Sequence, residues 1–240
     1  MEESIHVISY YHLALSFIPV FIVIYLLYRW RLSPGNGMYA VGRMVIQLLL
    51  VGYFLAFIFA AENAWIVLLV LTVMVLSSSW IALRTSQHKF SRLFPKALVS
   101  ILIGGGTVLL LITQAVLELS PWYKPSYMIP IAGMIFANAM NSISLAVERL
   151  ESELNRGATY EEARVIAFQT SLIPIINSLL AVGLVSLPGM MTGQILSGVS
   201  PLIAVRYQIM VMCMIFGSGG ITTAIFLYLI RSGYEKTQSV

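Results

Sequence analysis

The polar side chains that could do chemistry within the apolar parts of this chain are mostly amides. They are Gln47, Gln114, Asn138, Asn141, Asn177, Gln194 and Gln208. In a membrane helix an amide either joins two helices, at about 0.6–2 kcal/mol per hydrogen bond, or lines a hydrophilic path. Asn138 and Asn141 are three residues apart, so we expect both on the same side of a helix. For this pair the two roles are equally open, whereas an isolated amide such as Gln114 favours the first.

The sequence contains no group of residues typical of an enzyme. It has no Asp, a single cysteine and no G-x-x-x-x-G-K-[ST] stretch to hold phosphates. The three histidines have no metal-ligand spacing, so we assign no catalytic residue, no metal site and no cofactor. If ATP drives this protein, another chain must bind it. The twelve methionines offer soft thioethers that could pass Cu(I) or iron, but filling of the core is their favoured role.

These side chains belong to a membrane protein. Of the 240 residues, 59% are hydrophobic and 10% are charged, against roughly 25% charged in a soluble domain. Soluble enzymes and nucleic-acid-binding proteins are thereby excluded. Because a spanning helix needs ~20 apolar residues, we predict an all-α, single transmembrane domain over residues 1–240 with about seven spans. The spans are roughly Tyr10–Tyr28, Val41–Phe59, Ala64–Leu83, Ala97–Leu117, Tyr127–Val147, Ser171–Met191 and Ala204–Ile230.

Basic residues indicate the orientation of these spans, because cytoplasmic loops are enriched in Lys and Arg. All but Lys124 and Arg206 of the 14 bases lie in or beside the first, third and fifth loops or in the C-terminal tail. We therefore predict that the N-terminus lies outside and that the C-terminus lies in the cytoplasm, with the chain in the inner membrane of the cell.

Residues 148–170 form a polar cytoplasmic segment with a break at positions 156–158. Thr159 and Glu162 match a capping box, in which each side chain bonds the backbone N–H of the other, so a second short helix is expected to begin there. Ala163, Ile166 and Ala167 recur on one face of it, which could lie on the membrane surface or in a partner's groove. The alternative is a solvated extension of the fifth span.

Residues 165–205 carry no charge, and they are interrupted by Pro188 and several glycines. Lipid offers no partner to the backbone that a proline frees, so a kink or re-entrant turn here could line a path. An ordinary helix end is equally open. Small residues at four-residue spacing, such as Gly189 and Gly193, indicate a packing or dimer face. We take as the candidate translocation path Gln47, Asn138, Asn141, Pro188, Met190 and Met191.

Several stretches resemble the FetB family of ABC-transporter permeases, in register from about position 40 to 230. They are residues 129–135 (IPIAGMI), 138–140 (NAM), 182–193 (VGLVSLPGMMTG), 206–211 (RYQIMV), 41–43 (VGR) with Gln47, and 51–53 (VGY). The resemblance implies a permease, acting as a homodimer in the lipid bilayer, that pairs with a separate ATP-binding subunit. Bacterial members are associated with iron efflux, and plant relatives with aluminium tolerance and nucleotide-sugar transport.

The resemblance also implies a role for the capped helix. Gly157, Thr159, Glu162 and Ala163 resemble the coupling segment by which such permeases dock on their ATPase. One departure concerns residues 177–181 (NSLLA), where family members often read Asp-Ser-x-Lys-Thr; the loss of those charges leaves the substrate's identity open.

We therefore expect the permease subunit of an ATP-driven exporter, with an iron-like metal ion as substrate. The alternatives are a non-transporting membrane scaffold or assembly factor and an exporter of a small polar metabolite such as a nucleotide sugar. A secondary carrier is disfavoured, because no titratable side chain lies at the middle of a predicted span.

Overall fold

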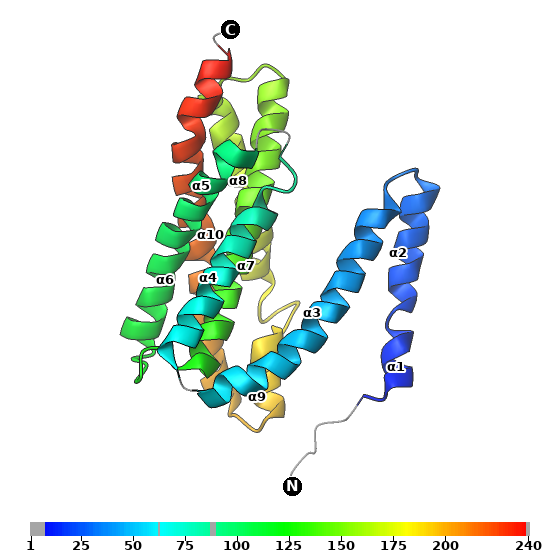
Figure 1. Cartoon of the computed structure of the whole chain (residues 1–240), viewed down its shortest axis with the longest axis vertical. Coiled ribbons are helices and arrows are strands. Elements are labelled where there is room, and N and C mark those ends of the chain that lie inside the picture. The colour runs from blue at the N-terminus through cyan, green and yellow to red at the C-terminus, as the bar shows by residue number, and fades with distance from the viewer. Residues whose placement is uncertain (1–7, 62, 87–89, 239–240) are drawn as a thin grey trace. The chain divides into compact units, whose positions relative to one another are not determined.

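The computed structural model describes residues 8–61, 63–86 and 90–238, and the regular elements in these ranges are all helices (Figure 1). Seven helical stretches of the described chain are long and apolar enough to cross a membrane, which confirms the predicted number of spans. The helices are α1 (Tyr10–Leu15), α2 (Ile18–Arg29), α3 (Pro34–Ala61), α4 (Ala64–Ala82), α5 (Phe90–Ser100), α6 (Gly106–Leu110), α7 (Pro125–Asn155), α8 (Tyr160–Ala181), α9 (Gly189–Leu196) and α10 (Pro201–Gln238). The π-helical stretch Ile101–Gly105 joins α5 to α6, and a second one, Leu111–Val116, continues α6, so that together they form one fourth span.

The chain divides into two compact units, Met1–Ala61 and Glu62–Val240. In the first unit α2 and α3 contact each other, and no residue of α1 or α2 is buried. Large apolar side chains such as Phe21, Leu49 and Phe54 are exposed on this unit. A helix that is apolar on all sides requires apolar surroundings, so lipid or another protein surface must cover it.

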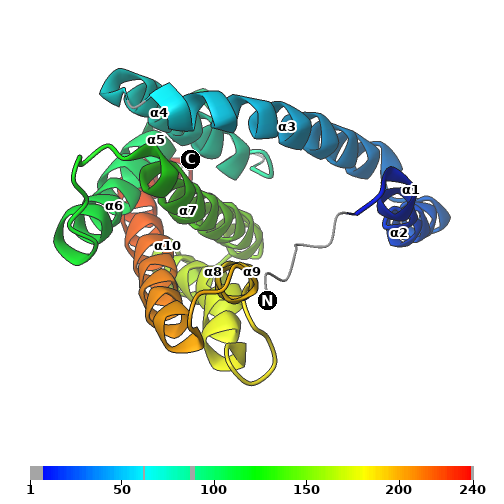
Figure 2. The same cartoon turned by 90° about the horizontal axis from the view of Figure 1, so that it is seen from below.

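The second unit is built around α7. This helix packs against α4, α8 and α10, and Figure 2 shows it between α4 on one side and α8 and α10 on the other. One face of α7 carries Ile135, Ala139, Ile143, Ala146 and Leu150, whose exposed fraction is 0% in each case. Their spacing of three or four residues follows the helical repeat, so a single apolar stripe of α7 forms the centre of the core.

Glycines bring α10 into close contact with its neighbours. A Cβ added at Gly104, in the fourth span, would lie 2.5 Å from Thr222 Oγ1 and 2.8 Å from the Thr222 backbone. A Cβ added at Gly219, in α10, would lie 2.6 Å from Ile175 Cδ1 of α8 and 2.9 Å from Ser142 Oγ of α7. The backbones therefore approach as closely as the absence of a side chain permits.

The glycines predicted to form a packing or dimer face behave differently. No atom of the described chain lies within 4 Å of a Cβ added at Gly189 or at Gly193. These two glycines therefore do not mediate helix packing within the described part of the chain, and a dimer face there stays a prediction.

The sixth span differs from the prediction of residues 171–191. It begins at Tyr160 with the capping box and α8 ends at Ala181; a turn then leads into the separate short helix α9. Hydrogen bonds within the turn pair several of its N–H groups: the Ala181 carbonyl accepts from the N–H groups of Val185 (2.8 Å) and Ser186 (3.2 Å). The predicted start was wrong because it followed the charged residues, whereas the cap determines where helical hydrogen bonding begins.

The break lies beside α7, part-way along that helix. It faces Asn138 of α7, which lies about 20 Å from the beginning of that helix at 1.5 Å per residue. Beyond the break, α9 lies toward the end of the unit at which α7 begins (Figure 1). The sixth span is thus two helices in series, joined by a hydrogen-bonded turn.

Replacement of Gly104 by Ala is expected to destabilise the second unit, because the added methyl group meets the Thr222 backbone at 2.8 Å. Separating the two helices should lower the free energy of unfolding by about 1–3 kcal/mol. Gly106→Ala is the matched control, since no atom lies within 4 Å of the Cβ added there. Thermal unfolding of both variants in detergent measures the difference, and equal Tm values would contradict the close packing.

Candidate functional site

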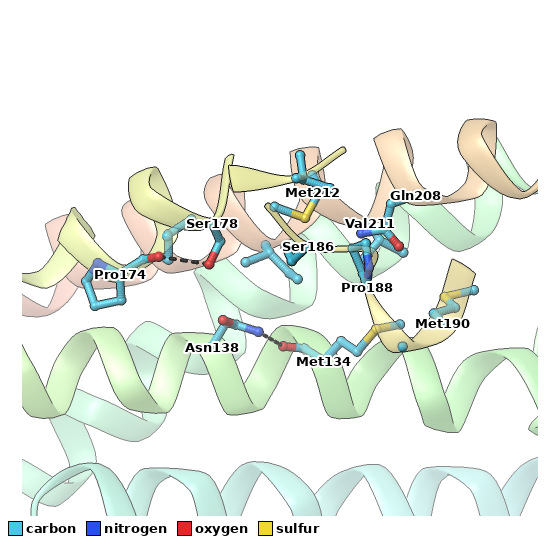
Figure 3. A pocket seen from close by; sticks show the side chains of 14 residues that line it. Met134, Asn138, Pro174, Ser178, Ser186, Pro188, Met190, Gln208, Val211 and Met212 are labelled. Carbon is cyan, nitrogen blue, oxygen red and sulfur yellow. Dashed lines mark hydrogen bonds between the residues drawn. The ribbon is translucent and has the colours of Figure 1, made fainter. Parts of the chain in front are cut away.

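A cavity of about 390 Å³, called the inner cavity below, lies beside the break in the sixth span (Figure 3). Its walls come from α7, the end of α8, the turn, the start of α9 and the first half of α10. None of the described residues that line it is charged. The residues that line the inner cavity are Met134, Asn138, Pro174, Ile175, Ser178, Val182, Ser186, Pro188, Gly189, Met190, Gln208, Val211, Met212 and Ile215.

Hydrogen bonds within the walls orient two of the polar side chains. Asn138 Nδ2 donates to the Met134 carbonyl at 2.8 Å, and a carbonyl accepts only from the amide nitrogen, so the assignment of the amide is determined. Ser178 Oγ donates to the Pro174 carbonyl at 2.9 Å. Gln208 is only 5% exposed, and its Oε1 has no hydrogen-bond partner among the described residues. Figure 3 shows these side chains approaching the cavity from three different helices.

A second cavity of about 530 Å³, the outer cavity, adjoins the first. Met134 and Met190 line both, so their side chains form the partition between the two. Gln194 of α9 lines the outer cavity, and its buried Oε1 also has no partner within the described chain. Each cavity therefore contains one buried amide oxygen without a hydrogen bond.

The structure brings together three of the six residues of the predicted path. Asn138, Pro188 and Met190 line the inner cavity. Met191 lines a different, almost wholly apolar cavity of about 370 Å³ beside Cys213.

The remaining two predicted residues do not join this group. Asn141 is exposed and lines neither the inner nor the outer cavity. The cavities contact only a narrow face of α7, and the step of three residues from Asn138 turns the Asn141 side chain away from that face. Gln47 is exposed on α3, in the other unit of the chain.

The predicted path did not include Gln208 and Gln194, which are among the seven amides of the apolar runs, or Met134, which is one of the twelve methionines. Each is a polar or sulfur-containing residue in an apolar run, as Gln114 is. What distinguishes Gln208 is that it is buried and that its oxygen is unpaired. Both properties arise from packing between helices, and no local sequence signal reports them.

At the opposite end of α8 lies the predicted coupling segment. Gly157 has a φ of +90°, which glycine adopts without strain, and it ends the turn after α7. Thr159 Oγ1 accepts from the Glu162 N–H at 3.4 Å. Glu162 Oε2 accepts from the Thr159 N–H at 3.0 Å. The predicted capping box is thus confirmed.

The helix that this cap begins is not the separate short helix that the sequence predicted. It is the first part of α8, while residues 148–155 continue α7. Ala163 and Ala167 are fully buried within the bundle, so the expected lipid-facing or partner-facing stripe was wrong. The buried Tyr160 hydroxyl donates to the Leu227 carbonyl of α10. Thr159 and Glu162 remain exposed beside these anchored residues.

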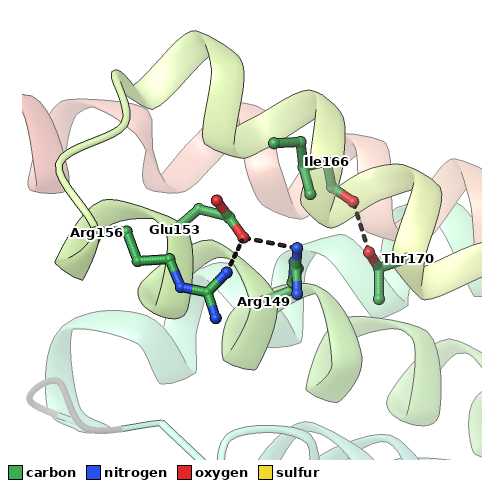
Figure 4. Close-up of polar contacts among 5 residues, drawn as sticks. All are labelled: Arg149, Glu153, Arg156, Ile166 and Thr170. Carbon is green, nitrogen blue, oxygen red and sulfur yellow. Dashed lines mark hydrogen bonds and ion pairs between the residues drawn. The ribbon is translucent and has the colours of Figure 1, made fainter.

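Ion pairs at this end join α8 to α10 and also form within the last turns of α7. Glu161 of α8 pairs with Arg164 at 2.6 Å and with Arg231 of α10 at 3.3 Å. Glu153 lies between Arg149 (2.7 Å) and Arg156 (3.2 Å) at the end of α7, as Figure 4 shows. The base-rich ends of α7 and α10 and the start of α8 thus meet at one end of the unit.

A buried carboxylate completes these contacts. Glu151 Oε1 accepts from Ser86 Oγ at 2.6 Å and from the Tyr234 hydroxyl at 3.0 Å. Burial, and secondly the charge of Glu151, raises the pKa of Tyr234 above its ordinary value, so the hydroxyl keeps the proton that it donates. The α4–α5 connection, α7 and α10 are therefore joined through one side chain.

Comparison with known proteins agrees with these features. The model of the uncharacterised protein family UPF0014 matches residues 10–234. A UPF0014 membrane protein of Synechocystis is 40% identical over 224 residues, covering 86% of this chain and 86% of the relative. The probable iron export permease protein FetB of Escherichia coli is 35% identical over 242 residues, covering 93% and 91%.

A plant relative is also similar. The protein ALUMINUM SENSITIVE 3 of Arabidopsis thaliana is 34% identical over 232 residues, covering 90% of this chain and 84% of its own length. No solved structure matches the chain. With the family matched over nearly the whole chain and relatives that include a permease, this multi-pass membrane protein belongs to the UPF0014 family and is a transport permease.

Proposed function

We propose that this permease exports an iron-like metal ion across the inner membrane and that a separate ATP-binding subunit drives it. The observation that carries the proposal is the inner cavity at the break in the sixth span. A polar, uncharged cavity at the depth of the spans suits a substrate that must enter and also leave. Discontinuous helices are a common way for transporters to build such a site. The name of the Escherichia coli relative supports iron as the substrate and export as the direction.

The energy source is the second element of the proposal. The sequence has no phosphate-binding loop and no Asp to hold the magnesium ion of a nucleotide. A separate ATPase, bound to a permease homodimer, would supply the hydrolysis. The α7–α8 turn is the docking point that we favour, because Thr159 and Glu162 are exposed there on a helix start that Tyr160 anchors.

Helix α8 would transmit the movement. It is continuous from Tyr160 to Ala181, a length of about 33 Å at 1.5 Å per residue. Its last turn, with Ser178, forms a wall of the inner cavity. A displacement of the capped start would therefore move the cavity wall, while the turn beyond Ala181 would take up the change in backbone angles. A membrane scaffold without transport requires neither this rigid connection nor a polar cavity.

Purification of the chain in mild detergent from its own host is expected to yield a bound subunit that hydrolyses ATP. The measurement is the stoichiometry of the complex and its ATP turnover. If the permease repeatedly purifies alone under gentle conditions, the scaffold function gains support and the ATP-driven mechanism loses it.

Gly157→Pro should lower transport at least about tenfold, equivalent to roughly 1.4 kcal/mol of coupling, with normal membrane insertion. Proline cannot adopt the positive φ of this position, so the turn and the start of α8 must shift. Glu162→Ala, which removes half of the capping box, should act in the same direction. Iron efflux from cells and co-purification of the ATPase are the two measurements.

The matched control for this turn is Gly198→Pro. Gly198 resembles Gly157 in two respects: its φ is also positive, at +85°, and no atom of the described residues lies within 4 Å of an added Cβ. It differs in its place, since it lies between α9 and α10. It should leave ATPase binding unchanged. Wild-type transport in both Gly157→Pro and Glu162→Ala would refute the coupling role of the α7–α8 turn.

A further inference from the structure

Two buried amide oxygens take part in none of the helix contacts described above. Gln208 is a lining residue of the inner cavity and Gln194 a lining residue of the outer cavity, and the Oε1 atom of each is buried. Neither has a hydrogen-bond partner within the described residues. A buried acceptor without a partner costs about 1–3 kcal/mol, so a ligand that interacts with these oxygens would offset that cost.

Two other polar groups of the inner cavity offer electron pairs, beside the second N–H that Asn138 Nδ2 keeps. Asn138 uses an amide proton on the Met134 carbonyl, which leaves its Oδ1 as the acceptor that remains. Ser178 uses its only hydroxyl proton on the Pro174 carbonyl, so its oxygen also remains an acceptor. Together with Gln208 Oε1, three side-chain oxygens with available lone pairs come from three different helices. Such a lining suits a cation.

The methionine sulfur atoms of the two cavities indicate which class of metal cation would bind. Met134 and Met190 separate the two cavities, and Met212 lines the inner one. Thioethers favour borderline and soft metal ions over Mg²⁺ and Ca²⁺, which take oxygen ligands. No three His, Cys, Asp or Glu side chains gather anywhere in the described ranges. A site of neutral ligands binds a metal weakly enough to release it, as transit requires.

The partition between the cavities is itself deformable. Methionine is unbranched and has three rotatable side-chain bonds, so it changes rotamer without movement of the backbone. Met134 lies on the continuous helix α7, whereas Met190 lies in the first turn of α9, directly after the break. A movement of α9 relative to α7 would therefore change how far the two sulfur atoms close the passage.

We infer that the two cavities are successive sites for one borderline-soft divalent cation, with Gln208 and Gln194 as oxygen ligands and the Met134–Met190 pair as the sulfur-lined passage between them. This inference rests on the proposed function and assigns its substrate path to residues. In each cavity the unpaired amide oxygen coordinates the cation. It passes from one oxygen to the next between the two thioethers, which replace part of its water shell.

Binding by the purified full-length chain in detergent tests this assignment. Equilibrium dialysis with Fe²⁺ under reducing, anaerobic conditions, and separately with Mg²⁺, gives the affinity and the preference. Gln208→Leu is expected to weaken Fe²⁺ binding at least about tenfold. Met134→Leu, which keeps size and apolarity, is expected to lower the preference for Fe²⁺ over Mg²⁺ with a smaller loss of affinity.

Three further variants complete the design. Gln114→Leu removes an exposed amide, and Met214→Leu removes a fully buried methionine; neither residue lines the two cavities, and both variants should bind as the wild type does. Gln208→Glu keeps the length of the side chain and adds a negative charge. It should bind Fe²⁺ more tightly than the wild type but export it more slowly, because release becomes limiting.

The outcomes separate this inference from the proposed function. If the wild type transports iron with its ATPase while Gln208→Leu, Gln208→Glu and Met134→Leu all match it in binding and transport, the assigned path is wrong and the permease function stands. If the wild type exports no iron in cells, the proposed substrate fails first. Tighter binding with slower export in Gln208→Glu would support the path even if Gln208→Leu failed to fold.

Discussion

The constraint on which the second unit depends is that backbone groups at membrane depth must find hydrogen-bond partners within the protein. Helix α8 ends at Ala181, and the Ala181 carbonyl accepts from the N–H groups of residues 184–186 in the turn that follows. These bonds give the N–H groups of the turn partners within the protein where the sixth span is interrupted. Because the helix stops there, its neighbours α7 and α10 face a gap, and the inner cavity occupies that gap.

The same interruption connects the cavity with the other end of the bundle. Between them α8 is held tightly, since Ile175 meets α10 where Gly219 has no side chain and where Ser142 of α7 also approaches. At its start, Tyr160 and Glu161 bind α10. A movement of α8 must therefore rearrange its contacts with α10 at both places, which favours two discrete arrangements over continuous deformation.

The chemistry of the cavities follows from what the packing leaves unpaired. Lone pairs on amide and hydroxyl oxygens, together with thioether sulfur, suit a cation of intermediate softness, and the lack of charge on the described lining residues keeps its binding weak. The family and its permease member agree with a transport role. The sulfur-lined partition and the two unpaired glutamine oxygens point to the order in which a cation would pass.

The sequence by itself determined the class of protein, the number of spans and the capping box at Thr159, because hydropathy and capping act over a few neighbouring residues. Three residues of the path that it predicted, Asn138, Pro188 and Met190, line one cavity in the structure. Only the tertiary structure decided that Asn141 lies outside that cavity, that Ala163 and Ala167 face the bundle, and that Gln208 is buried with an unpaired oxygen. These properties depend on which faces of α7, α8 and α10 meet, and residues far apart in the chain set that arrangement.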